Sequence, residues 1–216
     1  MSDQQDLLDR FSYNQGRRDQ GPNRQLAQEI ATGLDYDLLG HVIELLSINL
    51  KKQVENDVLL CLATLSEQAP EMLKTHAQQF IPFLHSKNNR SVWGTMIVLS
   101  NIAPLCKKEI YDALPTILKC MDEGTVVTRD HGFEILLHLY QDSLFVDEMY
   151  ALIREQIWVA PDNQLGQYTE KFLVHASPQH LEELLPVLND RQQQLEKVSH
   201  IKRLSKLTLR IQRQLT

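Results

Sequence analysis

Residues 81–140 contain the stretch that decides the fold: IPFLHSKNNR SVWGTMIVLS NIAPLCKKEI YDALPTILKC MDEGTVVTRD HGFEILLHLY. One pattern occurs twice. A short apolar group with a proline, at 81–84 and again at 114–118, is followed by a polar break and then by an apolar run, at 92–103 and again at 133–140. We interpret each half as a helix, a turn and a helix. The second helix of the first half is apolar on nearly every side, so neighbours must cover it on more than one side. Stacked hairpins provide that cover, which predicts an all-α fold made of repeats.

The same apolar group recurs along most of the chain. Its first residues are Ile43, Ile81, Leu114, Ile153 and Leu185, which lie 38, 33, 39 and 32 residues apart. Steps of this length between paired helices are typical of an α-solenoid. No segment alternates apolar and polar residues as a half-buried strand does. The sequence therefore predicts an all-α fold, a right-handed α-α superhelix of about five helical hairpins.

The repeated hairpins resemble HEAT repeats of the armadillo/HEAT superfamily. Pro82, Pro115 and Pro186 stand where that family has its first-helix proline, and Glu123 and Arg129 fall near its turn acid and second-helix arginine. The resemblance covers about residues 35–210 and implies a HEAT-like solenoid.

Other positions depart from the family pattern. Trp93 lies near the place of the arginine in the second hairpin, and Arg154 stands where the fourth hairpin should have proline. Because the family is defined by packing positions, the resemblance implies a fold and says little about activity.

The chain divides by composition into two parts. Residues 1–24 are mostly polar and predict a polar N-terminal arm, with one short helix or partial disorder. Residues 25–216 form the predicted solenoid. Within it, a helix should end at Gly33, because glycine adopts the left-handed conformation that follows a helix without strain.

The final helix is predicted over residues 192–214. Its apolar residues recur every three or four positions, and most of its basic residues fall outside that stripe. A terminal repeat needs a polar outer face, so we expect a basic capping helix, with Leu204 and Leu207 against the helix that contains Leu184 and Leu185. A helix on a membrane surface is the alternative, although the stripe lacks the Trp and Phe residues typical of such helices.

Charge is distributed unevenly. Residues 190–216 hold seven basic and two acidic residues, which leaves 15 basic and 26 acidic residues in the rest of the chain. An acidic body disfavours binding to a phosphate backbone. Nucleic acid is therefore an unlikely partner on charge alone.

Cysteine usage and hydropathy predict a cytoplasmic protein. Cys61, Cys106 and Cys120 are odd in number and have no Cys-x-x-Cys spacing, so we expect buried free thiols. No apolar run is long enough to span a membrane, and the first residues do not resemble a signal peptide.

The candidate binding residues are Arg90, which ends the polar break before one second helix, and four residues of the second helix in the next hairpin. We expect Arg90, Arg129, His131, Glu134 and His138 to contact a partner. The last three project from one helical face, but the two histidines lie about 10 Å apart along the axis, so a polar stripe is a better interpretation than a metal site. We expect no metal and no cofactor.

The sequence shows no recognisable catalytic residues and no glycine-rich phosphate loop. We expect Leu99 and Leu136 in the core, and Trp93 as a core aromatic residue. The leading hypothesis is a non-catalytic scaffold or adaptor that binds a protein or peptide on its concave face. The alternative is a relative of the HEAT-like DNA glycosylases that remove alkylated purines, because the segment 89–93 faintly resembles the helix starts of that branch.

Overall fold

The structure is a computed structural model, and it describes residues 2–215, with side chains from residue 4 onward. Over these residues the fold is all-α, with short 3-10 helices and no strand. The chain forms two compact units, Met1–Ile135 and Leu136–Thr216, and the boundary lies inside one helix, α9 (Val126–Tyr140). None of the helices in the described part of the chain is long and apolar enough to cross a membrane.

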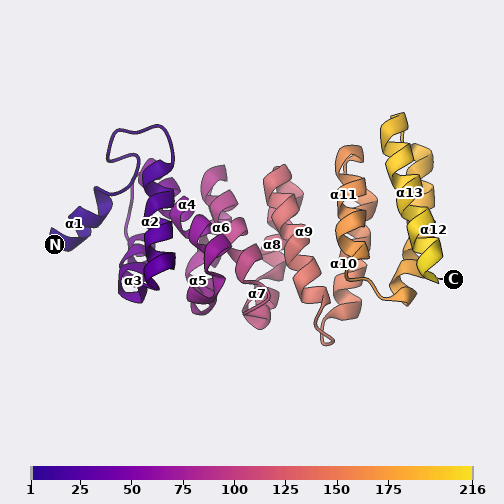
Figure 1. Cartoon of the computed structure of the whole chain (residues 1–216), viewed down its shortest axis with the longest axis horizontal. Helices are drawn as coiled ribbons and strands as arrows, with labels where there is room; N and C mark the ends of the chain where they lie inside the picture. The colour runs from indigo at the N-terminus through magenta and orange to yellow at the C-terminus, as the bar shows by residue number, and fades with distance from the viewer. Residues whose placement is uncertain (1, 216) are drawn as a thin grey trace. The chain divides into compact units, whose positions relative to one another are not determined.

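The first unit holds nine helices of the described chain and four 3-10 turns (Figure 1). The helices are α1 (Ser2–Leu8), α2 (Gly21–Gly33), α3 (Tyr36–Glu44), α4 (Lys52–Gln68), α5 (Ala77–Phe80), α6 (Asn89–Ile102), α7 (Lys107–Asp112), α8 (Leu114–Glu123) and the start of α9. The 3-10 turns are η1 (Leu45–Ser47), η2 (Pro70–Met72), η3 (Lys74–His76) and η4 (Ile81–His85).

The helices α2, α4 and α6 pack side by side in the core of this unit. α2 packs against α4, and α4 packs against α6, as Figure 1 also shows. The apolar run of α6 is covered on more than one side, and Leu99 is fully buried, as predicted. Leu136, in the second unit, is fully buried as well.

Side-chain caps start two of these helices. The Asp35 carboxylate accepts a hydrogen bond from the backbone N–H of Leu38 (2.8 Å) at the start of α3, and the Asn88 side chain caps α6. Such caps satisfy backbone donors that lack a partner inside the helix.

The segment 69–85 is less regular than predicted. The sequence predicts a helix that includes residues 81–84, whereas the structure has short 3-10 turns around the four-residue helix α5. Pro82 has no N–H to donate to the carbonyl group four residues earlier, so α5 cannot continue and η4 follows it.

The predicted left-handed residue is also displaced by one position. α2 includes Gly33, and Leu34 takes the left-handed conformation (φ 48°). The backbone N–H groups of Leu34 and Asp35 both bond to the Ile30 carbonyl, which closes the end of the helix.

The second unit follows the same packing order. It contains the end of α9 and then α10 (Val146–Val159), α11 (Asp162–Leu173), α12 (Pro178–Gln194) and α13 (Val198–Leu215). α10 packs against α12, α11 packs against α13, and the consecutive pairs α10–α11 and α12–α13 are also in contact. Each helix therefore contacts both its sequence neighbour and the next helix but one.

A buried aromatic cluster lies inside this unit. The Tyr140 hydroxyl is 2.8 Å from Nδ1 of His180 and accepts a hydrogen bond from the Ser177 N–H, while the Tyr150 hydroxyl donates to the His180 carbonyl. The Tyr150 ring stacks on His180 with 3.9 Å between centroids. The cluster joins α9, α10 and α12 through groups that are all hydrogen-bonded, as buried polar groups must be.

The final helix begins later than predicted, at Val198 instead of residue 192, because α12 continues to Gln194. Arg191 explains this extension. Its buried guanidinium donates to the Ala160 carbonyl and the Gln194 amide oxygen (both 2.8 Å) and to the Asp162 carboxylate (3.3 Å). These contacts hold the last turn of α12 against the turn between α10 and α11.

Leu204 and Leu207 of α13 are buried, and α13 packs against α12, the helix that contains Leu184 and Leu185. Most of the basic residues of α13 are exposed, among them Lys202, Lys206 and Arg210. Arg203 instead pairs with Glu170 of α11 at 2.5 Å.

Candidate functional site

Three adjoining cavities of the first unit all border on Trp93. Their volumes are about 520, 310 and 170 Å³. The two larger ones also share Asn56 and Arg90, and we call them together the Trp93 groove. Its lining residues are Gln20, Lys52, Gln53, Asn56, Leu60, Lys87, Asn88, Asn89, Arg90, Trp93, Gly94, Ile97 and Val127.

Polar contacts between α4 and α6 build one end of the groove. The Asn88 amide group donates to the Asn56 side-chain oxygen (2.6 Å) and to the Ser91 hydroxyl (2.7 Å), and the Ser91 hydroxyl donates to Glu55. Because Asn88 also caps α6, the same residue fixes where α6 starts and where it meets α4.

A glycine lets the two helices approach closely. A Cβ atom at Gly94 would lie 3.0 Å from the Leu59 Cβ and 3.4 Å from the Leu59 backbone. The residue before it, Trp93, is half-buried, which differs from the predicted core position. Its ring is therefore supported by α6 and still open to the groove.

The groove is basic although the chain has a net charge of −6. Lys52, Lys87 and Arg90 are exposed on its larger cavity, and no lining residue of the groove is acidic. The α4 and α6 helices both begin here, and the positive ends of their dipoles add to the charge of these side chains. The smaller cavity of the groove is mostly apolar, with Leu60, Ile97 and Val127 beside Trp93.

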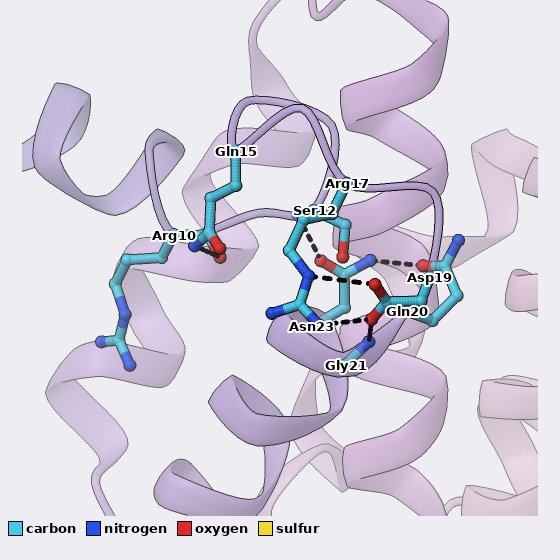
Figure 2. Close-up of polar contacts among 8 residues, drawn as sticks. All are labelled: Arg10, Ser12, Gln15, Arg17, Asp19, Gln20, Gly21 and Asn23. Carbon is cyan, nitrogen blue, oxygen red and sulfur yellow. Dashed lines mark hydrogen bonds and ion pairs between the residues drawn. The ribbon is translucent and has the colours of Figure 1, made fainter.

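The segment between α1 and α2 contributes one residue, Gln20, to the lining of the smaller cavity of the groove. Figure 2 shows Ser12, Asp19 and Gln20 beside Gly21 and Asn23 at the start of α2. The Ser12 N–H donates to the Asn23 side-chain oxygen (2.9 Å), and the Asn23 amide donates to Gln20 (2.6 Å), the residue that lines the groove.

This segment is anchored by buried residues. Leu7 and Phe11 are buried, and the Tyr13 N–H donates to the Asp57 carboxylate of α4 (2.7 Å). The carboxylate of Asp19 accepts from Arg17 and from the Gly21 N–H, and the hydrogen bond with Arg17 is the main cause that lowers the pKa of Asp19. The sequence pattern gave no signal that residues 1–24 contribute to a site, because their few apolar residues are spread among polar ones.

The predicted binding residues lie in different environments. Arg90 lines the groove. Arg129 is half-buried and donates to the Gly124 carbonyl (3.1 Å), so it supports the turn before α9. His131, Glu134 and His138 are half-buried along α9 and line none of the three cavities at Trp93. The structure therefore brings only Arg90 of the five into the groove.

Metal-binding residues do not cluster in the described part of the chain, where no group of three or more His, Cys, Asp or Glu side chains is placed to hold an ion. All three cysteines are free thiols, with Cys61 and Cys106 buried and Cys120 half-buried. Burial raises the pKa of Cys61 to about 12 and that of Cys106 to about 11, so both thiols stay protonated and unreactive near neutral pH.

A further cavity of about 670 Å³ lies in the second unit. It is bordered by α10 and α12 and lined by Ala151, Arg154, Glu155, Trp158, Glu183, Pro186 and Val187. Its charged residues include both signs, so it lacks the uniform charge of the Trp93 groove.

The chain is similar in structure to an engineered protein whose crystal structure comes from the Northeast Structural Genomics Consortium. The likeness covers 98% of this chain and 98% of that chain, with a TM-score of 0.62 and 16% sequence identity. At this identity the likeness supports the all-α fold alone. No known protein family matches the sequence, and no curated protein is significantly similar to it.

Proposed function

We propose that this chain is a HEAT-like α-solenoid, a right-handed superhelix of about five hairpins, that acts as a non-catalytic scaffold or adaptor. Its packing order supports this proposal, because in each unit a helix contacts the next helix but one, as in stacked helical repeats. The free thiols fit a reducing compartment such as the cytoplasm.

We assign the binding of a protein or peptide partner to the Trp93 groove. The observation that carries this assignment is the half-buried Trp93 ring, which borders three cavities at once. Tryptophan is enriched among the residues that dominate binding energy at interfaces, where it combines a large apolar surface with a polar N–H group.

Affinity capture with matched baits tests this proposal. The baits are the wild-type chain, Trp93→Ala, and Trp158→Ala as a control from the second unit. A captured protein is then purified, and its dissociation constant for each bait is measured by calorimetry. We expect Trp93→Ala to weaken binding at least about tenfold, as for a hot-spot residue, and Trp158→Ala to leave it unchanged. Equal affinity for all three baits would show that the groove is not part of the interface.

The second candidate function is nucleic-acid binding, in the manner of the HEAT-like DNA glycosylases. The observation that favours it is the set of three basic residues around an accessible tryptophan, because single strands bind by stacking bases on aromatic rings in basic grooves. A titration of labelled duplex and single-stranded DNA at low salt tests it. Tight binding that weakens steeply with salt would replace the scaffold proposal.

A further inference from the structure

We propose that the Trp93 groove selects an acidic peptide segment that carries one large apolar side chain. The apolar side chain enters the smaller cavity beside Trp93, and the carboxylates of the peptide face Lys52, Lys87 and Arg90. This inference rests on the proposed function and names the chemistry of the partner.

The smaller cavity suits an apolar side chain. Its volume of about 310 Å³ lies at the lower end of the range of about 300–1,000 Å³ typical of ligand pockets. Leu60, Trp93, Ile97 and Val127 present apolar surface to it. Removing a large apolar side chain from water into such a cavity stabilises the complex.

The larger cavity suits anionic groups. Its only charged lining residues are Lys52, Lys87 and Arg90, and the other polar ones are carboxamides. A basic peptide would meet three like charges, and none of the described residues that line this cavity is a carboxylate. An acidic peptide is attracted to the same charges, and the guanidinium of Arg90 matches a carboxylate through two parallel hydrogen bonds.

The two cavities share Asn56, Arg90 and Trp93, so a single short segment reaches both. The Asn88 amide donates to the Asn56 side-chain oxygen, which orients Asn56 so that its own N–H groups are the donors left for a ligand. The partner segment therefore places its carboxylates and its apolar side chain close together in sequence.

A peptide fits these observations better than a nucleic acid. Three cations neutralise few phosphates, and the third cavity at Trp93 includes the acidic Glu123, which repels a phosphate backbone that continues past the groove. The smaller cavity is mostly apolar, and its polar lining residues among those described are Gln20, Asn56 and Arg90. A peptide can place a neutral side chain there and keep its charges at the basic end.

The test is a selection of random 12-residue peptides on the full-length chain, followed by titration of the selected peptides as fluorescein-labelled synthetic probes. We expect the selected peptides to combine several Asp or Glu residues with at least one Leu, Ile, Phe, Trp or Met. Trp93 itself reports the binding. The chain has two tryptophans, so in a Trp158→Phe background a change in emission on titration places the peptide at the groove.

Charge variants separate attraction at the groove from the net charge of the protein. The variant Lys52→Glu/Lys87→Glu/Arg90→Glu should weaken the binding of the peptide probes at least about tenfold. The matched control Lys202→Glu/Lys206→Glu/Arg210→Glu makes the same change of charge on exposed residues of α13 and should have little effect. The milder variant Lys52→Gln/Lys87→Gln/Arg90→Gln serves if the reversal impairs folding, which the helical signal and the melting temperature reveal.

The outcomes distinguish the two proposals. Selected peptides that lack acidic residues but lose binding with Trp93→Ala overturn the acidic inference and leave the proposed function standing. Peptides that bind wild type and Trp93→Ala equally, or no selected peptides at all, overturn both. Displacement of the probes by a low concentration of single-stranded DNA of mixed sequence overturns the peptide inference in favour of nucleic acid.

Discussion

Leu34 is the only non-glycine residue with a positive φ in the described part of the chain. An L residue with a side chain is strained in this conformation by about 1–2 kcal/mol, whereas glycine adopts it freely. The Leu34 side chain is 60% exposed, so it contributes little packing that a substitution would remove.

We therefore expect Leu34→Gly to stabilise the protein by about 1 kcal/mol, measured from the denaturant midpoint at a constant slope. Leu144→Gly is the matched control, because Leu144 is 83% exposed and has a negative φ. If the control gained as much stability as Leu34→Gly, backbone strain at Leu34 would not be the cause.

Arg191 gives a second prediction at this scale. Its guanidinium satisfies the Ala160 carbonyl, the Asp162 carboxylate and the Gln194 amide together, and the side chain is buried. A lysine ammonium is a single point of charge and cannot reach all three groups. We expect Arg191→Lys to lower the free energy of unfolding by about 2–3 kcal/mol, the loss expected for hydrogen bonds to a charged group.

Chemical denaturation measures the effect, and Arg210→Lys on the exposed face of α13 is its control. A surface charge of this kind contributes at most about 1 kcal/mol. An Arg191→Lys variant as stable as wild type would show that the contacts of Arg191 do not hold the end of α12.

At the scale of the helices, the long apolar runs predicted helices and buried residues most reliably. The helix around residues 92–103 and the burial of Leu99 follow from a pattern that spans several turns, and the structure confirms both. The ends were harder to predict. Pro82 ends α5 early, and Arg191 extends α12 through contacts with residues about 30 positions away.

The Trp93 groove could be predicted only in part. Arg90 was predicted as a binding residue, and it lines the groove. Trp93 was assigned to the core, because helical spacing alone does not show whether a neighbour covers a side chain. Gln20, Asn56 and Val127 come from separate segments that meet only in the folded chain. The groove depends on the close approach of α4 and α6 at Gly94 and on the contacts that hold Gln20 in place. Neither feature leaves a periodic pattern in the sequence.

The last helix carries a prediction at the same scale. α13 covers apolar residues of α11 and α12 and buries Leu204, Leu207 and Ile211 of its own. Deleting residues 198–216 exposes the faces that α13 covers, so we expect aggregation or a large loss of stability, measured by gel filtration and thermal unfolding.

The variant Arg203→Ala is the control for that deletion. It loses the exposed pair with Glu170 and keeps the rest of α13 in place, so we expect a change of about 1 kcal/mol. A truncated chain that stays stable and soluble but no longer binds anionic vesicles would identify α13 as a membrane-surface helix instead.

Across the whole molecule, buried acidic groups predict a loss of stability at alkaline pH. Burial raises the pKa of Cys61 from 9.0 to about 12 in the first unit and that of Tyr150 from 10.0 to about 12 in the second. The unfolded chain releases these protons at lower pH than the folded chain does. The stability that these two protonated groups give the folded state is complete below about pH 9, and it is lost as the pH rises towards 12.

Urea unfolding at a series of pH values between 8 and 11 measures this slope, which is the change in the free energy of unfolding with pH. Cys61→Ala and Tyr150→Phe each remove one titrating group, so each variant should lose less stability over this range than wild type does. Slopes equal to that of wild type in both variants would show that other groups cause the alkaline loss.

The packing order described above also determines how the chain folds during its synthesis. Among the hydrogen bonds described, the longest sequence separation is 44 residues, between Tyr13 and Asp57, in a chain of 216. Contacts of such short range lower the entropy cost of loop closure and favour fast folding. Each helix of a unit can find its partners soon after it leaves the ribosome, whereas the segment between α1 and α2 must wait for α4 to be made before Tyr13 can bond to Asp57.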